Sequence, residues 1–213
     1  MSDPILIMGA TSGIGRCAVD EAVMRGLSVR AFSRSADDLQ GLEGVEPVPG
    51  DARNADDVAA ALKGARAVVY ALGIKERVSM LWEKETLFSE STRVLLDEMG
   101  KSDVRRLVAV TGFGAGRSKN AMSFVERTGH RAILGKPYED KDRQEALILE
   151  SNIDWTIVRP VILTKGGRST DYKILREPDQ WRNGLISRKS VAHYLIDAVE
   201  NDLDVRADVV LAR

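Results

Sequence analysis

Three glycines near the start of the chain have the type and spacing to bind a phosphate. Gly9, Gly13 and Gly15 follow the apolar run 5–8 and precede an amphipathic segment, 17–25. This order predicts a strand, a tight turn and a helix. Gly9 would permit the turn, Gly13 would let the backbone approach a pyrophosphate, and Gly15 would let the helix pack closely on the strand. The N–H groups of the first helical turn would face the anion, so the spacing favours a dinucleotide site over a purely structural turn. The other residues of the loop assigned to this site are Thr11, Ser12 and Ile14.

The end of the second predicted strand carries a cation between two hydroxyls. Ser33, Arg34 and Ser35 stand where a dinucleotide site holds the adenosine ribose. An acidic residue at this place is typical of an NAD site, whereas a cation accommodates a 2′-phosphate. Arg34 therefore favours NADPH, although an exposed loop arginine is the alternative. Asp37 and Asp38 are close enough in sequence to leave NAD(H) open as a second cofactor.

The third and fourth predicted strands also end in candidate cofactor contacts. Asp51 and Ala52 follow the third strand, where Asp51 could accept a hydrogen bond from the adenine amino group. An acid flanking a helix that begins near Asn54 is the alternative. The residues that end the fourth strand would lie beside the cofactor ribose, unless their glycine merely closes the strand: they are Ala71, Leu72 and Gly73.

Alternating strand and helix signals run through most of the chain. Near-continuous apolar runs separated by helical patterns are typical of a parallel sheet covered on both faces. The predicted fold is therefore α/β, a doubly wound parallel sheet in one domain over 1–213, with a small substrate-side region formed by about 112–137 and 161–186. The predicted strands are 5–8, 28–33, 45–48, 65–72, 104–110, 153–158 and, at a sheet edge, 208–212. The predicted helices are 17–25, 54–63, 81–100, 139–151 and 187–200, with a short one over 120–127.

The composition is that of a globular protein without a specialised partner surface. The 213 residues have a net charge of -1, which gives no basic excess for nucleic acid, and no apolar run is long enough to span a membrane. The single cysteine excludes an internal disulfide and, with only two histidines, makes a zinc site unexpected. We expect a cytoplasmic, metal-free monomer or homodimer that acts on a small molecule.

Seven blocks of the sequence together resemble a known family. They are 9–15, 33–34, 50–51, 71–73, 111–112, 141–145 and 154–160. On these blocks the chain resembles the short-chain dehydrogenase/reductase superfamily, and within it the atypical NAD(P)H-binding branch that includes NmrA-like regulators and biliverdin/flavin reductase-like enzymes. The resemblance covers nearly the whole chain and implies a Rossmann-type fold with an NAD(P) cofactor.

The resemblance also implies catalytic roles. Complete members of the superfamily use a Ser or Thr hydroxyl, a Tyr that acts as acid or base, and a Lys that holds the nicotinamide ribose. By this resemblance Thr111 takes the position of the hydroxyl, and Lys141 that of the lysine. Both would also contact the cofactor. On residue spacing alone, Lys141 and Glu145 could instead form an exposed i,i+4 pair.

The tyrosine departs from the pattern of the family. Complete members place it four residues before the lysine, where this chain has Pro137; Tyr138 is one position further on. A shift of one residue turns a helical side chain by about 100°. Tyr138 could still reach the site if the helix begins only at Glu139. The alternative is an aromatic side chain packed on the body of the protein.

Several further residues could complete the acceptor side. Three glycines in the loop 112–116 permit a close backbone approach, and Phe113 could either stack on a planar substrate or anchor the core. Pro160 and Ile162 would form an apolar wall beside the nicotinamide. His130 is a second candidate proton donor, although a lone histidine is more often structural.

These features predict an NADPH-dependent reductase. It would transfer a hydride to a planar, electron-poor acceptor such as a flavin, a quinone or a conjugated carbonyl. Such acceptors need little acid catalysis, so the proton could come from solvent, from Tyr138 or through Thr111. The alternative is a non-catalytic NAD(P)-binding redox sensor of the NmrA-like type, which explains the displaced tyrosine equally well.

Overall fold

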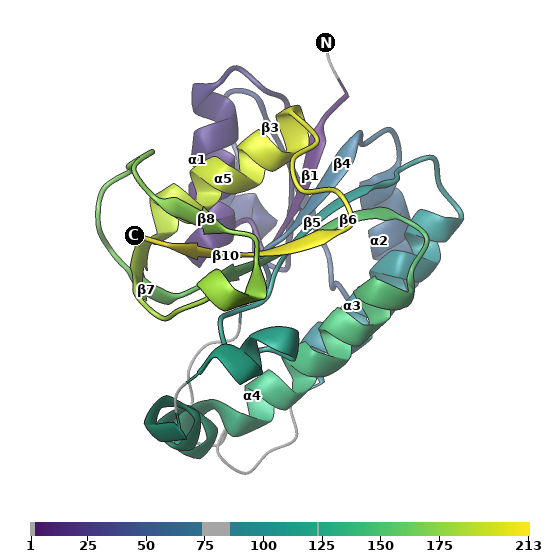
Figure 1. Cartoon of the computed structure of the whole chain (residues 1–213). Coiled ribbons are helices and arrows are strands. Elements are labelled where there is room, and N and C mark those ends of the chain that lie inside the picture. Colours follow the sequence, from purple (N-terminus) through teal and green to yellow (C-terminus); the bar gives the residue numbers. More distant parts are fainter. Residues whose placement is uncertain (1–2, 74–85, 123) are drawn as a thin grey trace.

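A twisted central sheet organises the molecule (Figure 1). The computed structural model describes residues 3–73, 86–122 and 124–213, and for residues 124–136 it describes the backbone alone. Within these residues eight strands form the sheet in the order β3-β2-β1-β4-β5-β6-β10-β8, with all pairs parallel except β10 and β8. The strands are β1 (Ile5–Met8), β2 (Val29–Ser33), β3 (Val45–Pro49), β4 (Ala67–Tyr70), β5 (Arg106–Val110), β6 (Asp154–Pro160), β8 (Lys173–Leu175) and β10 (Ala207–Ala212). The order 3-2-1-4-5-6 is that of the Rossmann fold, so the predicted doubly wound sheet is confirmed.

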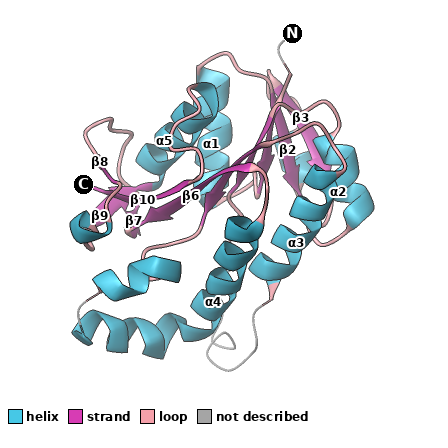
Figure 2. Ribbon diagram, turned by 45° about the vertical axis from the view of Figure 1, so that its right-hand side comes forward, coloured by secondary structure: helices cyan, strands magenta, loops and turns pink. Residues whose placement is uncertain are grey.

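Helices cover both faces of the sheet (Figure 2). They are α1 (Gly13–Met24), α2 (Ala55–Leu62), α3 (Leu87–Gly100), α4 (Phe124–Glu150) and α5 (Arg188–Glu200). The helices α1 and α5 pack together on one face, and α2, α3 and α4 pack in succession on the other. None of the described helices is long and apolar enough to cross a membrane.

The two hydrophobic cores follow from the alternation of side chains along the strands. In β1, Ile5 and Ile7 face the core beneath α1 and α5, whereas Leu6 and Met8 face the core beneath α2 and α3. Because successive side chains of a strand point to opposite faces, a strand that is apolar throughout must be covered on both sides.

Small elements complete the carboxyl edge of the sheet. The strands β7 (Ile162–Thr164) and β9 (Leu185–Ser187) form a separate two-stranded parallel sheet. In the described connections lie the 3₁₀ helices η1 (Ala36–Leu39), η3 (Gly116–Ala121) and η4 (Pro178–Gln180). These elements supply part of the site described below.

The structure confirms some predicted element boundaries and corrects others. The Asn54 side chain accepts hydrogen bonds from the amides of Asp56 and Asp57 and so caps α2 as predicted. The last strand is not at the edge, because β8 from the predicted excursion pairs antiparallel with it. In the region of the predicted helix 120–127, the structure instead places the end of η3 and the start of α4. Residues 81–85 of another predicted helix lie outside the described residues.

The long helix α4 is the largest difference from the sequence prediction. It begins at Phe124 rather than Glu139 and contains Pro137. Figure 2 shows a sharp bend in this helix. A proline removes one backbone hydrogen bond and crowds the preceding turn, which is the usual cause of such a bend. A helix can therefore continue through a residue that, in a sequence, indicates its start.

Candidate functional site

The predicted glycine turn joins β1 to α1 in a way that tolerates no side chains at two positions. Gly9 has φ +81°, and a Cβ atom there would lie 2.6 Å from the carbonyl oxygen of Ala71. A Cβ atom on Gly15 would lie 2.2 Å from the carbonyl oxygen of Gly9. Gly13, with φ +58°, has open space in front of it. The turn is therefore packed tightly on its protein side and open on the side where a phosphate would bind.

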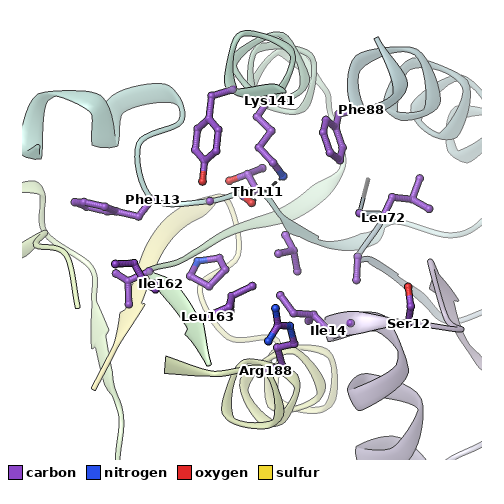
Figure 3. A pocket seen from close by; sticks show the side chains of 18 of the residues that line it. Ser12, Ile14, Leu72, Phe88, Thr111, Phe113, Lys141, Ile162, Leu163 and Arg188 are labelled. Atoms are coloured by element: carbon purple, nitrogen blue, oxygen red, sulfur yellow. Dashed lines mark hydrogen bonds between the residues drawn. The ribbon is translucent and has the colours of Figure 1, made fainter. Parts of the chain in front are cut away.

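A cavity of about 590 Å³ opens at the carboxyl ends of β1, β4, β5 and β6 (Figure 3). In a doubly wound sheet this edge is where ligands bind. Ten of the predicted site residues line the cavity together with Tyr138: they are Ser12, Gly13, Ile14, Ala71, Leu72, Gly73, Thr111, Lys141, Pro160 and Ile162. Phe113 also lines it and is almost fully buried, so it serves both the core and the cavity wall.

Lys141 extends from α4 into the top of this cavity, as Figure 3 shows. Its Nζ atom donates a hydrogen bond to the backbone carbonyl of Thr111 at 2.8 Å and lies 4.2 Å from the centre of the Phe88 ring. Burial lowers the pKa of the ammonium to about 8, against the opposing charges of Glu145 and Asp140. The lysine is thus held in place as a cation that is costly to bury and that titrates near neutral pH.

Tyr138 reaches the same cavity although it lies inside the helix and not in a flexible lead-in to it. Residues three apart share a helix face as residues four apart do, so the displaced tyrosine still stands beside Lys141. Its hydroxyl lies close over Gly112, where a Cβ atom would be 2.6 Å away. Burial, with a smaller contribution from Glu145, raises the pKa of the phenol to about 12. The phenol is therefore neutral and weakly acidic.

The predicted catalytic threonine belongs to a buried charge network. The Thr111 hydroxyl donates to Oε1 of Glu145 at 2.7 Å. Arg159 donates to both oxygens of Glu145, at 2.9 and 2.7 Å, and also pairs with Asp208, which Arg117 contacts from outside. Glu145 is buried, so the interpretation of Lys141 and Glu145 as an exposed pair is wrong. The carboxylate faces inward because a buried guanidinium is there to neutralise it.

A second buried carboxylate positions the helix that carries Phe88. Asp140 accepts hydrogen bonds from the amide of Phe88 at 2.8 Å and from the amide and hydroxyl of Ser89. Thr86, the N-cap residue of α3, forms no capping hydrogen bond through its own side chain. Asp140 therefore caps α3 from the neighbouring helix α4 and holds Phe88 against Lys141.

The predicted adenosine contacts gather at the ends of β2 and β3. The Thr11 hydroxyl lies 3.1 Å from that of Ser35 and 3.3 Å from that of Ser33. Arg34 is exposed next to them. The pKa of Asp51 is lowered, first by hydrogen bonds from Arg53 and, to a smaller extent, by the charge of Arg34. Arg34 and Asp51 follow the paired strands β2 and β3, so both lie at the same edge of the sheet.

Neither Ala52 nor His130 is among the described residues that line the cavity. Ala52 is buried in the core beneath α2, where it would support the site and not line it. The side chain of His130 lies outside the described residues.

Sequence reasoning did not single out six of the residues that line the cavity: Phe88, Val110, Met122, Leu163, Asn183 and Arg188. Arg188 carried a usable signal, because it opens the predicted helix 187–200. A helix that leads into a parallel strand begins at the edge of the sheet where ligands bind.

Comparison with known proteins identifies the family. The model of the NAD(P)H-binding family matches residues 9–202, which is most of the chain. The chain belongs to the NAD(P)H-binding family. The family model thus includes the glycine turn, the cavity and α5.

Other comparisons agree with the NAD(P)H-binding family and with the fold. Sterol demethylase protein B of Methylococcus capsulatus is 31% identical over 169 residues, which are 74% of this chain and 51% of that protein. The chain thus spans about half the length of this curated relative. Among solved structures, the anaerobilin reductase ChuY of Escherichia coli O157:H7 is 24% identical with a TM-score of 0.81, over 98% of this chain and 96% of that one. A short-chain dehydrogenase/reductase of Veillonella parvula, solved with NADP, is 18% identical with a TM-score of 0.83, over 100% and 95%. These structures show a shared Rossmann-type fold.

Proposed function

We propose that this chain is an NADPH-dependent reductase that passes a hydride to a planar, electron-poor acceptor. The observation that carries the proposal is the meeting of Gly13, Lys141, Tyr138 and Pro160 on one cavity. The glycine turn fits a pyrophosphate, and the charged and phenolic groups lie further along the same cavity. A bound reduced nicotinamide would supply the hydride.

Lys141 and Tyr138 have separate roles in the proposed reaction. Lys141, held between the Thr111 carbonyl and the Phe88 ring, is placed to bind the ribose next to the nicotinamide. Tyr138 presents a neutral phenol over Gly112. The phenol can donate a hydrogen bond to an oxygen or nitrogen atom of the acceptor as negative charge develops there.

A weak acid suits an acceptor that needs little help with protonation. The pKa of Tyr138 is raised to about 12 by burial, and the Thr111 hydroxyl is engaged with Glu145. A flavin, quinone or conjugated carbonyl spreads the charge it receives, whereas a simple ketone does not. The site therefore favours the conjugated acceptors.

We assign the acceptor to the side of the cavity that is lined by residues within 112–122 and 161–183. Phe113, Met122, Ile162 and Leu163 give this side an apolar surface suited to a planar ring. This side of the cavity is thus mostly apolar, with Asn183 as a polar group among its lining residues.

The preference for NADPH rests on Arg34. It is exposed beside the hydroxyl cluster of Thr11, Ser33 and Ser35, where a 2′-phosphate would lie. Replacing Arg34 with Ala is expected to weaken NADPH binding much more than NADH binding. Equal losses for the two cofactors, measured by calorimetry, would refute this assignment.

The test of the function is steady-state oxidation of NADPH with a panel of acceptors. We expect oxidation that depends on a flavin or a quinone and is slower with a simple ketone. A panel in which only simple ketones react would contradict the proposed acceptor class.

A redox sensor of the NmrA-like type remains the second candidate. It is favoured by the engagement of the Thr111 hydroxyl with Glu145 and by the high pKa of Tyr138, which together leave the proton relay of complete reductases unassembled. Tight NADPH binding without oxidation by any acceptor, together with nucleotide-dependent association with a protein partner, would support this function instead.

A further inference from the structure

Arg188, the first residue of α5, lines the cavity from the side opposite Lys141. Figure 3 shows its guanidinium beside Ile14, across the cavity from Lys141. The side chain is partly buried. Its one described hydrogen bond runs from Nη1 to the backbone carbonyl of Thr164 at 3.2 Å, which fixes the side chain along the cavity wall.

Arg188 differs from Arg25 and Arg159 in its lack of a described counter-charge. Arg25 pairs with three carboxylates, and Arg159 pairs with two. Within the part of the chain that the structure describes, Arg188 makes no ion pair. A guanidinium has five N–H donors, and the hydrogen bond to Thr164 uses one of them. A cation that is partly desolvated at the wall of a cavity, with donors to spare, is suited to an anionic ligand.

The charge of Arg188 lies close to the first turns of α1. Burial and Asp20 raise the pKa of the Cys17 thiol on this helix, and the charges of Lys189 and Arg188 act against that rise. The same cavity wall contains Gly13 and Ile14, whose backbone begins α1. An anion over this turn would therefore lie within reach of the guanidinium as well.

We propose that Arg188 binds the pyrophosphate of the dinucleotide from the side opposite the glycine turn. The inference deepens the proposed function, because it rests on a dinucleotide lying across this cavity. Arg188 would then act on NADPH and NADH alike, whereas Arg34 acts on the 2′-phosphate alone. The two arginines divide the recognition of the cofactor into a general part and a selective part.

The test compares ligands that share only some groups of the cofactor. NADPH, NADH and ADP-ribose contain the pyrophosphate, whereas adenosine 2′-monophosphate contains a 2′-phosphate and no pyrophosphate. In calorimetric or competition titrations, Arg188→Gln is expected to raise the Kd of the first three by similar factors, roughly tenfold to hundredfold, and to leave the fourth unchanged. Arg34→Ala is expected to give the opposite pattern, weakening NADPH and adenosine 2′-monophosphate.

Two further variants distinguish a direct contact of Arg188 with the pyrophosphate from a general effect of positive charge, and a stability measurement excludes misfolding. Lys189→Gln removes the same charge from the adjacent exposed position and is expected to change Kd by less than about twofold. Arg188→Lys keeps the charge without the planar fork and is expected to give an intermediate loss. Thermal unfolding of each variant checks that it is folded.

The results that would overturn the inference are nucleotide affinities, which are measured without turnover. Unchanged nucleotide affinities in Arg188→Gln would do so; a raised KM for the acceptor in that variant would then place Arg188 at the acceptor. A loss for NADPH without a loss for ADP-ribose would place it at the nicotinamide. Failure of the proposed reductase function would appear as absent oxidation in the wild type, with these binding differences intact.

Discussion

At the scale of single residues, Lys141 shows a conflict between stability and function. Its side chain is partly buried at the cavity wall, and this burial lowers its pKa to about 8 from an ordinary value of 10.5. The unfolded chain then binds more protons between these two pH values, so the free energy of unfolding should rise as the pH increases from 8 to 10.5. Below pH 8 the folded protein carries the full cost of the buried charge.

Replacing Lys141 with Met tests this cost. The variant loses one hydrogen bond to Thr111 but no longer buries a charge, so we expect a gain in stability of about 1–2 kcal/mol at pH 7. The gain should disappear as the pH approaches 10.5. Denaturant unfolding at a series of pH values measures it, and a variant that is less stable than wild type at pH 7 would contradict the account.

Gly112 is predicted to keep room for the Tyr138 phenol. A Cβ atom at this position would lie 2.6 Å from the Tyr138 hydroxyl, so Gly112→Ala should displace the phenol. We expect a clear fall in kcat with little change in the Kd of NADPH or in the melting temperature. The matched control is Gly167→Ala, which has open space around its Cβ atom and should leave kcat unchanged. Equal kcat values in the two variants would show that the phenol has no part in turnover.

At the scale of elements, the Glu145–Arg159–Asp208 network ties α4, β6 and β10 together beneath the cavity. Replacing Arg159 with Met would leave the buried carboxylate of Glu145 without its ion-pair partner and Asp208 with Arg117 alone. We expect a loss of about 3–5 kcal/mol in the free energy of unfolding, measured by chemical denaturation. The control, Arg16→Met, removes an exposed pair with Asp20 and should cost about 1 kcal/mol or less. A small effect of Arg159→Met would mean that water or a rearrangement satisfies these carboxylates.

The secondary-structure elements differ in how well the sequence predicts them. The apolar strands and the Asn54 cap were predictable, because side-chain alternation and capping are local. The course of α4 was not predictable. Pro137 has a local preference to begin a helix, and the packing of Tyr138 and Lys141 in the cavity outweighs this preference. The position of β10 inside the sheet depends on its pairing with β8, a contact between segments more than thirty residues apart.

The site was predictable where its residues follow strands along the chain. The glycine turn and the ends of the next strands meet because parallel strands end at the same edge. The buried position of Glu145 was not predictable, because its partner Arg159 comes from another element. The same holds for Arg188, whose place on the cavity wall depends on how α5 packs against α1.

At the scale of the whole molecule, buried carboxylates link stability to pH. Burial alone would raise the pKa of Asp208, but Arg117 and Arg159 hold it below its ordinary value. Arg168 and Arg25 do the same for Glu21, again against its burial. Both carboxylates therefore contribute stability above their unfolded pKa values, near 3.8 and 4.5, that is lost as the pH falls.

We accordingly expect the protein to lose stability steeply on acidification below about pH 4.5. Chemical denaturation at a series of acidic pH values measures the loss. A free energy of unfolding that stays constant down to pH 3 would show that these carboxylates have ordinary pKa values in the folded protein.

We propose that one cavity both binds the nicotinamide and carries out the reduction. The most direct measurement follows NADPH absorbance with a flavin or quinone acceptor for wild type and for Lys141→Met, with the Kd of NADPH measured for both proteins. We expect acceptor-dependent oxidation by wild type and a loss of roughly a hundredfold in the variant, because without Lys141 the nicotinamide ribose is no longer held in place. The Kd of NADPH should change much less, because the proposed contacts to the pyrophosphate and the 2′-phosphate remain. Tight NADPH binding by wild type without oxidation of the nucleotide, or equal rates in the two proteins, would contradict this proposal.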